Sequence, residues 1–175
     1  MSTQHLRYLS RTLILGALAG LTGGAAEIGW VSLYGALSGT PAIVVARGIL
    51  AAVMPGWTPS SYAVSFGILI HLGLAATLGI SLAFALRLLF RSHRRAHVEF
   101  GWVTLALATV WAVNFFALLP QVSPGFVHLL PLWTTLLSKL LFGFGAAAVF
   151  CAGRTPAPGQ PSRAVSTASG SQPGP

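Results

Sequence analysis

The chain alternates long apolar segments with short polar connections. Four segments hold about 20 or more mostly apolar residues, the length at which a helix crosses the hydrocarbon core of a bilayer. A fifth apolar run covers roughly 20 Å at about 1.5 Å per residue and is too short to span. The predicted spans are residues 13–37, 62–90, 100–119 and 131–152, and the short run is 42–54.

This pattern predicts an all-α integral membrane four-helix bundle, with an extra short helix after the first span that is interfacial or re-entrant. Gly39 and Pro41 separate the first span from the short helix, because Gly favours helix ends and Pro suits a first turn. Residues 1–12 are predicted to form a cytoplasmic N-terminus. Residues 153–175, rich in Pro, Ser and Gly, are predicted to form a disordered cytoplasmic tail.

Composition and charge exclude an ordinary soluble domain. Apolar residues make up 54% of the 175 residues and charged residues 7%, whereas soluble domains carry about 25% charged residues. The net charge of +8 comes from ten basic residues against two acidic ones. The basic residues lie mainly in connections and at the chain ends, which is typical of membrane insertion and not of a nucleic-acid-binding face. We therefore expect a lipid bilayer, and no nucleic acid, as the surroundings.

The distribution of Arg residues predicts the orientation. They gather before the first span, between the second and third spans, and after the fourth. Because cytoplasmic loops are enriched in Lys and Arg, both termini are expected to be cytoplasmic, in a multi-pass protein of the bacterial inner membrane.

Small residues recur at every fourth position in three of the predicted spans. Such stripes let membrane helices approach closely, and they face other helices in preference to lipid. The glycines expected at helix contacts are Gly16, Gly20, Gly24, Gly67, Gly79 and Gly143.

Each span also carries one strongly polar residue away from its ends: Glu27, His71, Asn114 and Lys139. In the four-span topology, Glu27, His71 and Lys139 fall about 12–15 Å below the outer boundary, and Asn114 lies shallower. An ionisable side chain inside the membrane needs a partner or a function. We expect a buried polar cluster made of these four residues.

Two functions fit such a cluster. In the first, an ion pair between Glu27 and Lys139, with hydrogen bonds from His71 and Asn114, fixes helix packing in an accessory or structural protein. In the second, the same groups line a path for a proton, a cation or a small polar solute in a small transporter or channel subunit. Four helices form a narrow bundle, so a homo-oligomer or a larger membrane complex is an expected partner.

Other candidates for the site are weaker. Arg47 either reaches inward to Glu27 or extends to lipid phosphates, and His128 lies near the outer rim. A haem held by two histidines needs both of them at the same depth in the membrane, whereas His71 is predicted to be deep and His128 to be near the outer rim. A metal site needs three or four ligands. Cys151 is alone and no catalytic motif is present. We expect no cofactor, no metal and no enzymatic activity.

The segments GALAGLTGGAAEIGW, VARGI, IHLGLA, WAVNFFALLP and LLSKLLFGFGAA together resemble short bacterial inner-membrane proteins that lack an assigned activity. The resemblance covers residues 13 to about 151. It implies a four-helix protein with its polar residues inside the bundle, and it carries no mechanism.

Overall fold

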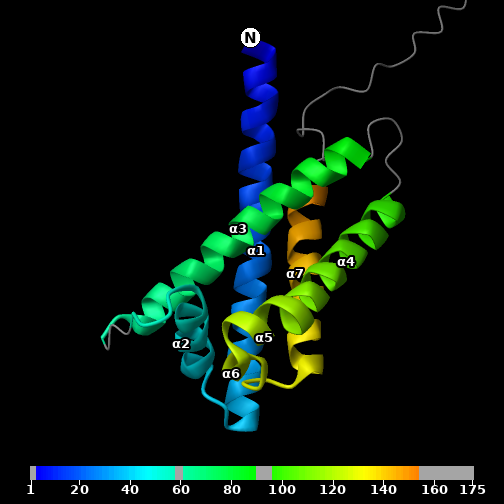
Figure 1. The fold of residues 1–175 in the computed structure, drawn as a ribbon. Coiled ribbons are helices and arrows are strands. Elements are labelled where there is room, and N and C mark those ends of the chain that lie inside the picture. Colours follow the sequence, from blue (N-terminus) through cyan, green and yellow to red (C-terminus); the bar gives the residue numbers. More distant parts are fainter. Residues whose placement is uncertain (1–2, 58–60, 90–95, 154–175) are drawn as a thin grey trace, which may run out of the picture.

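The computed structural model describes residues 3–57, 61–89 and 96–153, and within these ranges the secondary structure is helical, without strands. The elements are α1 (Thr3–Ser38), α2 (Ala42–Val53), α3 (Ala63–Leu89), α4 (Ala96–Val113), the π-helical turn η1 (Asn114–Leu118), α5 (Leu119–Val122), α6 (Pro124–Val127) and α7 (Leu132–Ala152) (Figure 1). The predicted all-α class is confirmed. The predicted tail lies outside the described residues, apart from Gly153.

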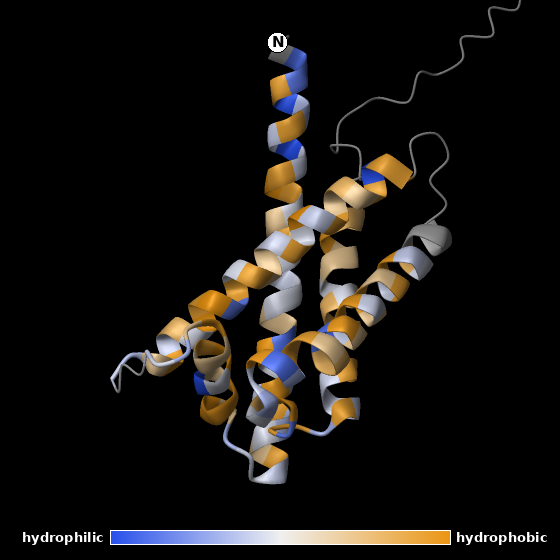
Figure 2. Cartoon of the chain, in the orientation of Figure 1, coloured by the Kyte–Doolittle hydropathy of each residue, from blue (hydrophilic) through white to orange (hydrophobic). Residues whose placement is uncertain are grey.

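Four helical segments are long and apolar enough to cross a membrane, as the sequence predicts: Gln4–Ser38, Ala63–Leu89, Phe100–Val122 and Leu132–Ala152. Large apolar side chains on their outer surfaces are exposed, for example Leu69 and Phe116, both at 63%. Apolar residues therefore cover the outside of the molecule as well as its core (Figure 2). This distribution suits a lipid environment, where an outward-facing apolar side chain carries no penalty.

The helices are arranged around α1. Helix α1 contacts α3 on one side and α7 on another, while α4 packs on α7 and α2 packs on α3. The N-terminal end of α1, the C-terminal end of α3, the start of α4 and the end of α7 all lie toward the same side of the molecule (Figure 1). The long helices therefore run alternately in opposite directions.

The third long segment does not end at residue 119, where its span was predicted to end, but continues through Pro120 to Val122. Proline has no N–H, and its ring clashes with the carbonyl four residues earlier in a regular α-helix. The π turn η1 ends two positions before Pro120, and Leu119 N–H bonds to the Asn114 carbonyl, five residues back. The wider turn carries the helix past the proline.

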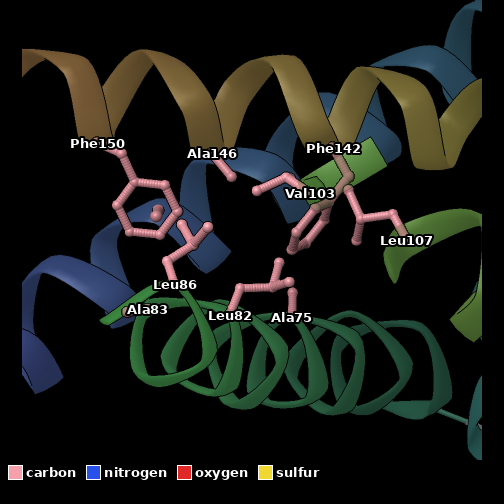
Figure 3. Packing of buried hydrophobic residues seen from close by; sticks show 10 residues of the cluster. Ala75, Leu82, Ala83, Leu86, Val103, Leu107, Phe142, Ala146 and Phe150 are labelled. Atoms are coloured by element: carbon pink, nitrogen blue, oxygen red, sulfur yellow. The ribbon is translucent and has the colours of Figure 1, made fainter. Parts of the chain in front are cut away.

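The apolar core is built from residues of α1, α3, α4 and α7. Phe142 is completely buried, and Figure 3 shows its ring directed from α7 toward α3. Small residues face the large ones, which allows side chains to interdigitate. The buried core residues are Ala19, Ala75, Leu82, Ala83, Leu86, Val103, Leu107, Phe142, Ala146 and Phe150.

Glycines bring the helix backbones into direct contact. A Cβ atom on Gly20 would collide with the Ala75 carbonyl oxygen, and one on Gly79 would collide with the Gly16 carbonyl oxygen. A Cβ on Gly24 would lie 2.7 Å from Ala75 Cβ. The α1–α3 contact therefore exists only because these positions have no side chain.

The other two predicted packing glycines lie at different interfaces. A Cβ on Gly67 would collide with the backbone of Ala46, which joins α3 to α2. A Cβ on Gly143 would lie 3.0 Å from Leu107 Cδ1, between α7 and α4. All six glycines therefore face another helix.

We predict that Gly20→Ala lowers the free energy of unfolding by about 1–3 kcal/mol, because the added methyl forces α1 and α3 apart. The matched control is Gly29→Ala on the same helix, where a Cβ would meet no atom within 4 Å. Thermal unfolding of the purified protein in detergent measures both. Equal stability of the two variants would contradict this account of the contact.

Candidate functional site

The predicted acid and amine form an ion pair. Lys139 Nζ on α7 lies 2.6 Å from Glu27 Oε1 on α1. Glu27 is only 3% exposed, and the Lys139 side chain is 18% exposed. A charged carboxylate without a partner is strongly unfavourable in a buried or membrane setting, and here the Lys139 ammonium lies within ion-pair distance of it.

A serine adds a hydrogen-bonding group to the same carboxylate. Ser138 Oγ lies 3.3 Å from Glu27 Oε1 and 2.8 Å from the Thr135 carbonyl oxygen, so its single proton has two acceptors. Ser138 is not among the residues predicted for the cluster, because a serine in a membrane helix commonly bonds its preceding turn. Ser138 does so as well. Its position next to Lys139 in the sequence is the one feature that could have indicated a bond to Glu27 as well.

The imidazole of His71 approaches the other carboxylate oxygen. His71 Nε2 on α3 lies 3.5 Å from Glu27 Oε2 and makes no hydrogen bond within the described residues. A distance of 3.5 Å is at the outer limit for a hydrogen bond. Glu27 is thus in contact with α3 and α7 at once, although it belongs to α1.

The cluster lies on the wall of a partly open cavity of about 590 Å³. Asn114, from η1, lines the same cavity without a hydrogen bond to Glu27 within the described structure. Most of the remaining lining is aliphatic, and it comes mainly from α1, α2 and α3, with Val110 of α4 and Leu119 of α5 adding to it. The structure therefore brings Glu27, His71 and Lys139 together, and places Asn114 on the wall of the same cavity without a hydrogen bond to any of the three within the described residues.

Two further candidates lie away from the cluster. Arg47 on α2 and His128 after α6 are both exposed, and neither lines the cavity. Of the two bases that could have paired with Glu27, the structure pairs Lys139 with it.

Two tryptophans donate hydrogen bonds to α7 in the turn before Ser138 and Lys139. Trp30 Nε1 on α1 donates to the Thr134 carbonyl oxygen at 3.1 Å, and Trp111 Nε1 on α4 donates to Thr135 Oγ1 at 3.0 Å. Both bonds lie within one turn of Ser138. Depth arguments from sequence do not detect such bonds, because they place a side chain along its own helix and not against the atoms of a neighbouring helix.

Comparisons with models of protein families, with curated proteins and with solved structures found no match. In the described part of the chain, no group of three or more His, Cys, Asp or Glu residues lies close enough together to hold a metal ion. The chemistry of the site therefore has to be argued from its own geometry: a neutralised carboxylate, an adjacent imidazole and an apolar cavity.

We predict that Glu27→Gln and Lys139→Met each lower the free energy of unfolding by about 3–5 kcal/mol, because each leaves one buried charge without its partner. The double variant should lose much less than the sum, since no lone charge remains. Thermal unfolding in detergent measures the cycle.

The matched control for this cycle is Arg47→Met, which removes an exposed charge and should change stability by no more than about 0.5 kcal/mol. Additive losses in the double variant would show that Glu27 and Lys139 do not stabilise the protein as a pair.

Proposed function

We propose that the chain is a small integral membrane protein with a structural or accessory role, in which the polar cluster fixes the packing of α1 against α3 and α7. The observation that supports this role is the 2.6 Å distance between Glu27 and Lys139. A buried ion pair this close holds two helices in a single register, as polar groups do between membrane helices.

The proposed setting is a four-helix bundle in the bacterial inner membrane with both termini in the cytoplasm. The Arg residues near the chain ends support this orientation under the positive-inside rule. The start of α1 and the end of α7 lie toward the same side of the molecule, which agrees with an even number of spans (Figure 1). Helix α2, with 12 residues, is about 18 Å long, so an interfacial or re-entrant position suits it.

The proposed partners are the lipid bilayer and either further copies of the chain or a larger membrane complex. Exposed apolar side chains on every long helix leave surface for lipid and for another membrane protein alike. Gly16, Gly20 and Gly24 of α1 are already used within the chain, against α3. An intermolecular contact would therefore use other surfaces.

A transport function is the second candidate, and a specific observation favours it. His71, Glu27 and Lys139 form a continuous series of titratable groups, with successive distances of 3.5 and 2.6 Å, on the wall of a partly open cavity. Such series carry protons in membrane proteins. Because Glu27 is already paired closely with Lys139, its carboxylate is poorly suited to binding and releasing a transported proton or cation. We therefore rank transport second.

We predict that vesicles containing the protein leak protons no faster than protein-free vesicles, because the structural role gives Glu27 a fixed partner. A pH-sensitive dye inside the vesicles, after an external acid pulse, reports the rate. Glu27→Gln and Arg47→Met should behave like the unaltered protein. A protein-dependent flux that Glu27→Gln abolishes and Arg47→Met preserves would establish the transport function in place of the structural one.

We predict that alkaline phosphatase is active when fused after Trp57 and inactive when fused after Gly153, since these positions fall on opposite sides of the proposed membrane topology. A fluorescent protein that folds only in the cytoplasm should give the reverse pattern. Phosphatase activity after Gly153 would place the C-terminus outside the cytoplasm and refute the orientation.

A further inference from the structure

The cavity beside the ion pair combines two properties that the structural role does not require. Its volume of about 590 Å³ falls within the range of about 300–1,000 Å³ typical of small-molecule sites. Its lining is mainly aliphatic, as at Ile28, Ile49 and Ile68, yet the polar cluster lies on one part of its wall. A site with an apolar wall and a few convergent polar groups is the usual form of a pocket for an amphiphilic molecule.

The charge of the polar wall selects the kind of head group. Glu27 and Lys139 compensate each other, so the wall has no net charge. An anionic or cationic head group would bring one uncompensated charge into a buried site, which is strongly unfavourable. An uncharged hydroxyl group can donate to the carboxylate and accept from a donor without disturbing this balance.

His71 supplies an independent reason to expect a polar ligand. Its Nε2 atom is buried and, apart from the 3.5 Å contact with Glu27 Oε2, has no partner with hydrogen-bond geometry in the described structure, although it belongs to a residue that lines the cavity. A buried polar atom left in this state is costly. The Asn114 amide, also on the cavity wall, adds a donor and an acceptor.

We propose that this cavity binds an uncharged amphiphile, with a hydroxyl head group at Glu27, His71 and Lys139 and an apolar body along α2 and α3. The cavity has the volume of roughly 20 water molecules, at about 30 Å³ each. This binding function goes beyond the structural role of the ion pair and does not depend on transport.

The test uses four 12-carbon probes that differ only at one end: 1-dodecanol, dodecanoate, dodecylammonium and dodecane. Each radiolabelled probe is equilibrated with protein-containing and protein-free vesicles, and the saturable excess in the former measures binding. We expect saturable binding of dodecanol near one per protein, at least about tenfold tighter than that of the other three, the size of effect that one buried hydrogen bond or charge produces.

The location of the site is tested with Ile68→Trp, which fills the cavity without changing the polar cluster. The matched control is Leu69→Trp, the adjacent residue, which is 63% exposed and does not line the cavity. Ile68→Trp should abolish the saturable binding of dodecanol, and Leu69→Trp should retain it. Binding that survives Ile68→Trp would overturn the assignment to this cavity.

The charge balance of the polar wall is tested with two further variants. Glu27→Gln leaves Lys139 as a lone cation and should shift the preference toward dodecanoate, whereas Lys139→Met should shift it toward dodecylammonium. Dodecane bound as tightly as dodecanol would show a site for apolar chains only. Tighter binding of dodecanoate or dodecylammonium to the unaltered protein, or the absence of saturable binding, would likewise overturn the proposal.

Discussion

The single carboxylate within the predicted spans determines how the rest of the structure must be built. Glu27 is 3% exposed, so its charge requires a counter-charge that reaches it from another helix. Lys139 provides that counter-charge from α7, and this fixes both the depth and the rotation of α7 against α1. The two tryptophan bonds to Thr134 and Thr135 then hold α7 in the orientation that the ion pair needs.

Backbone packing and the polar cluster depend on the same small residues. Helix α3 lies directly against α1 because Gly16, Gly20 and Gly79 have no side chains. The contact continues to Gly24, where a Cβ would lie 3.8 Å from His71 Nε2. Any larger residue along this stripe moves α3 outward and takes the imidazole away from Glu27. These glycines of α1 and Glu27 lie on one side of the helix because both face α3: the glycines allow α3 to approach, and the approach brings His71 to Glu27.

Hydrophobic length and period were sufficient to predict the four long helices, and helix depth was sufficient to select Glu27, His71 and Lys139 as residues at one level. These features follow from distances along a single helix, which a sequence contains directly. The choice of Lys139 over Arg47, the part played by Ser138 and the cavity all depend on distances between helices, which composition and spacing do not contain. The start of α1 at Thr3 was missed for another reason, because hydropathy marks where a helix enters lipid and not where it begins.

The π turn before Pro120 has a consequence for the cavity as well as for the helix that contains it. Residues five apart come into line across a π turn, whereas residues three or four apart do so in an α-helix. Asn114 and Leu119, which are joined by the five-residue hydrogen bond of this turn, both line the cavity. In a regular α-helix, two residues five positions apart would point in clearly different directions. Because Pro120 disfavours the regular helix at this point, the proline acts indirectly on the cavity: it favours the turn that presents Asn114 there together with an apolar wall.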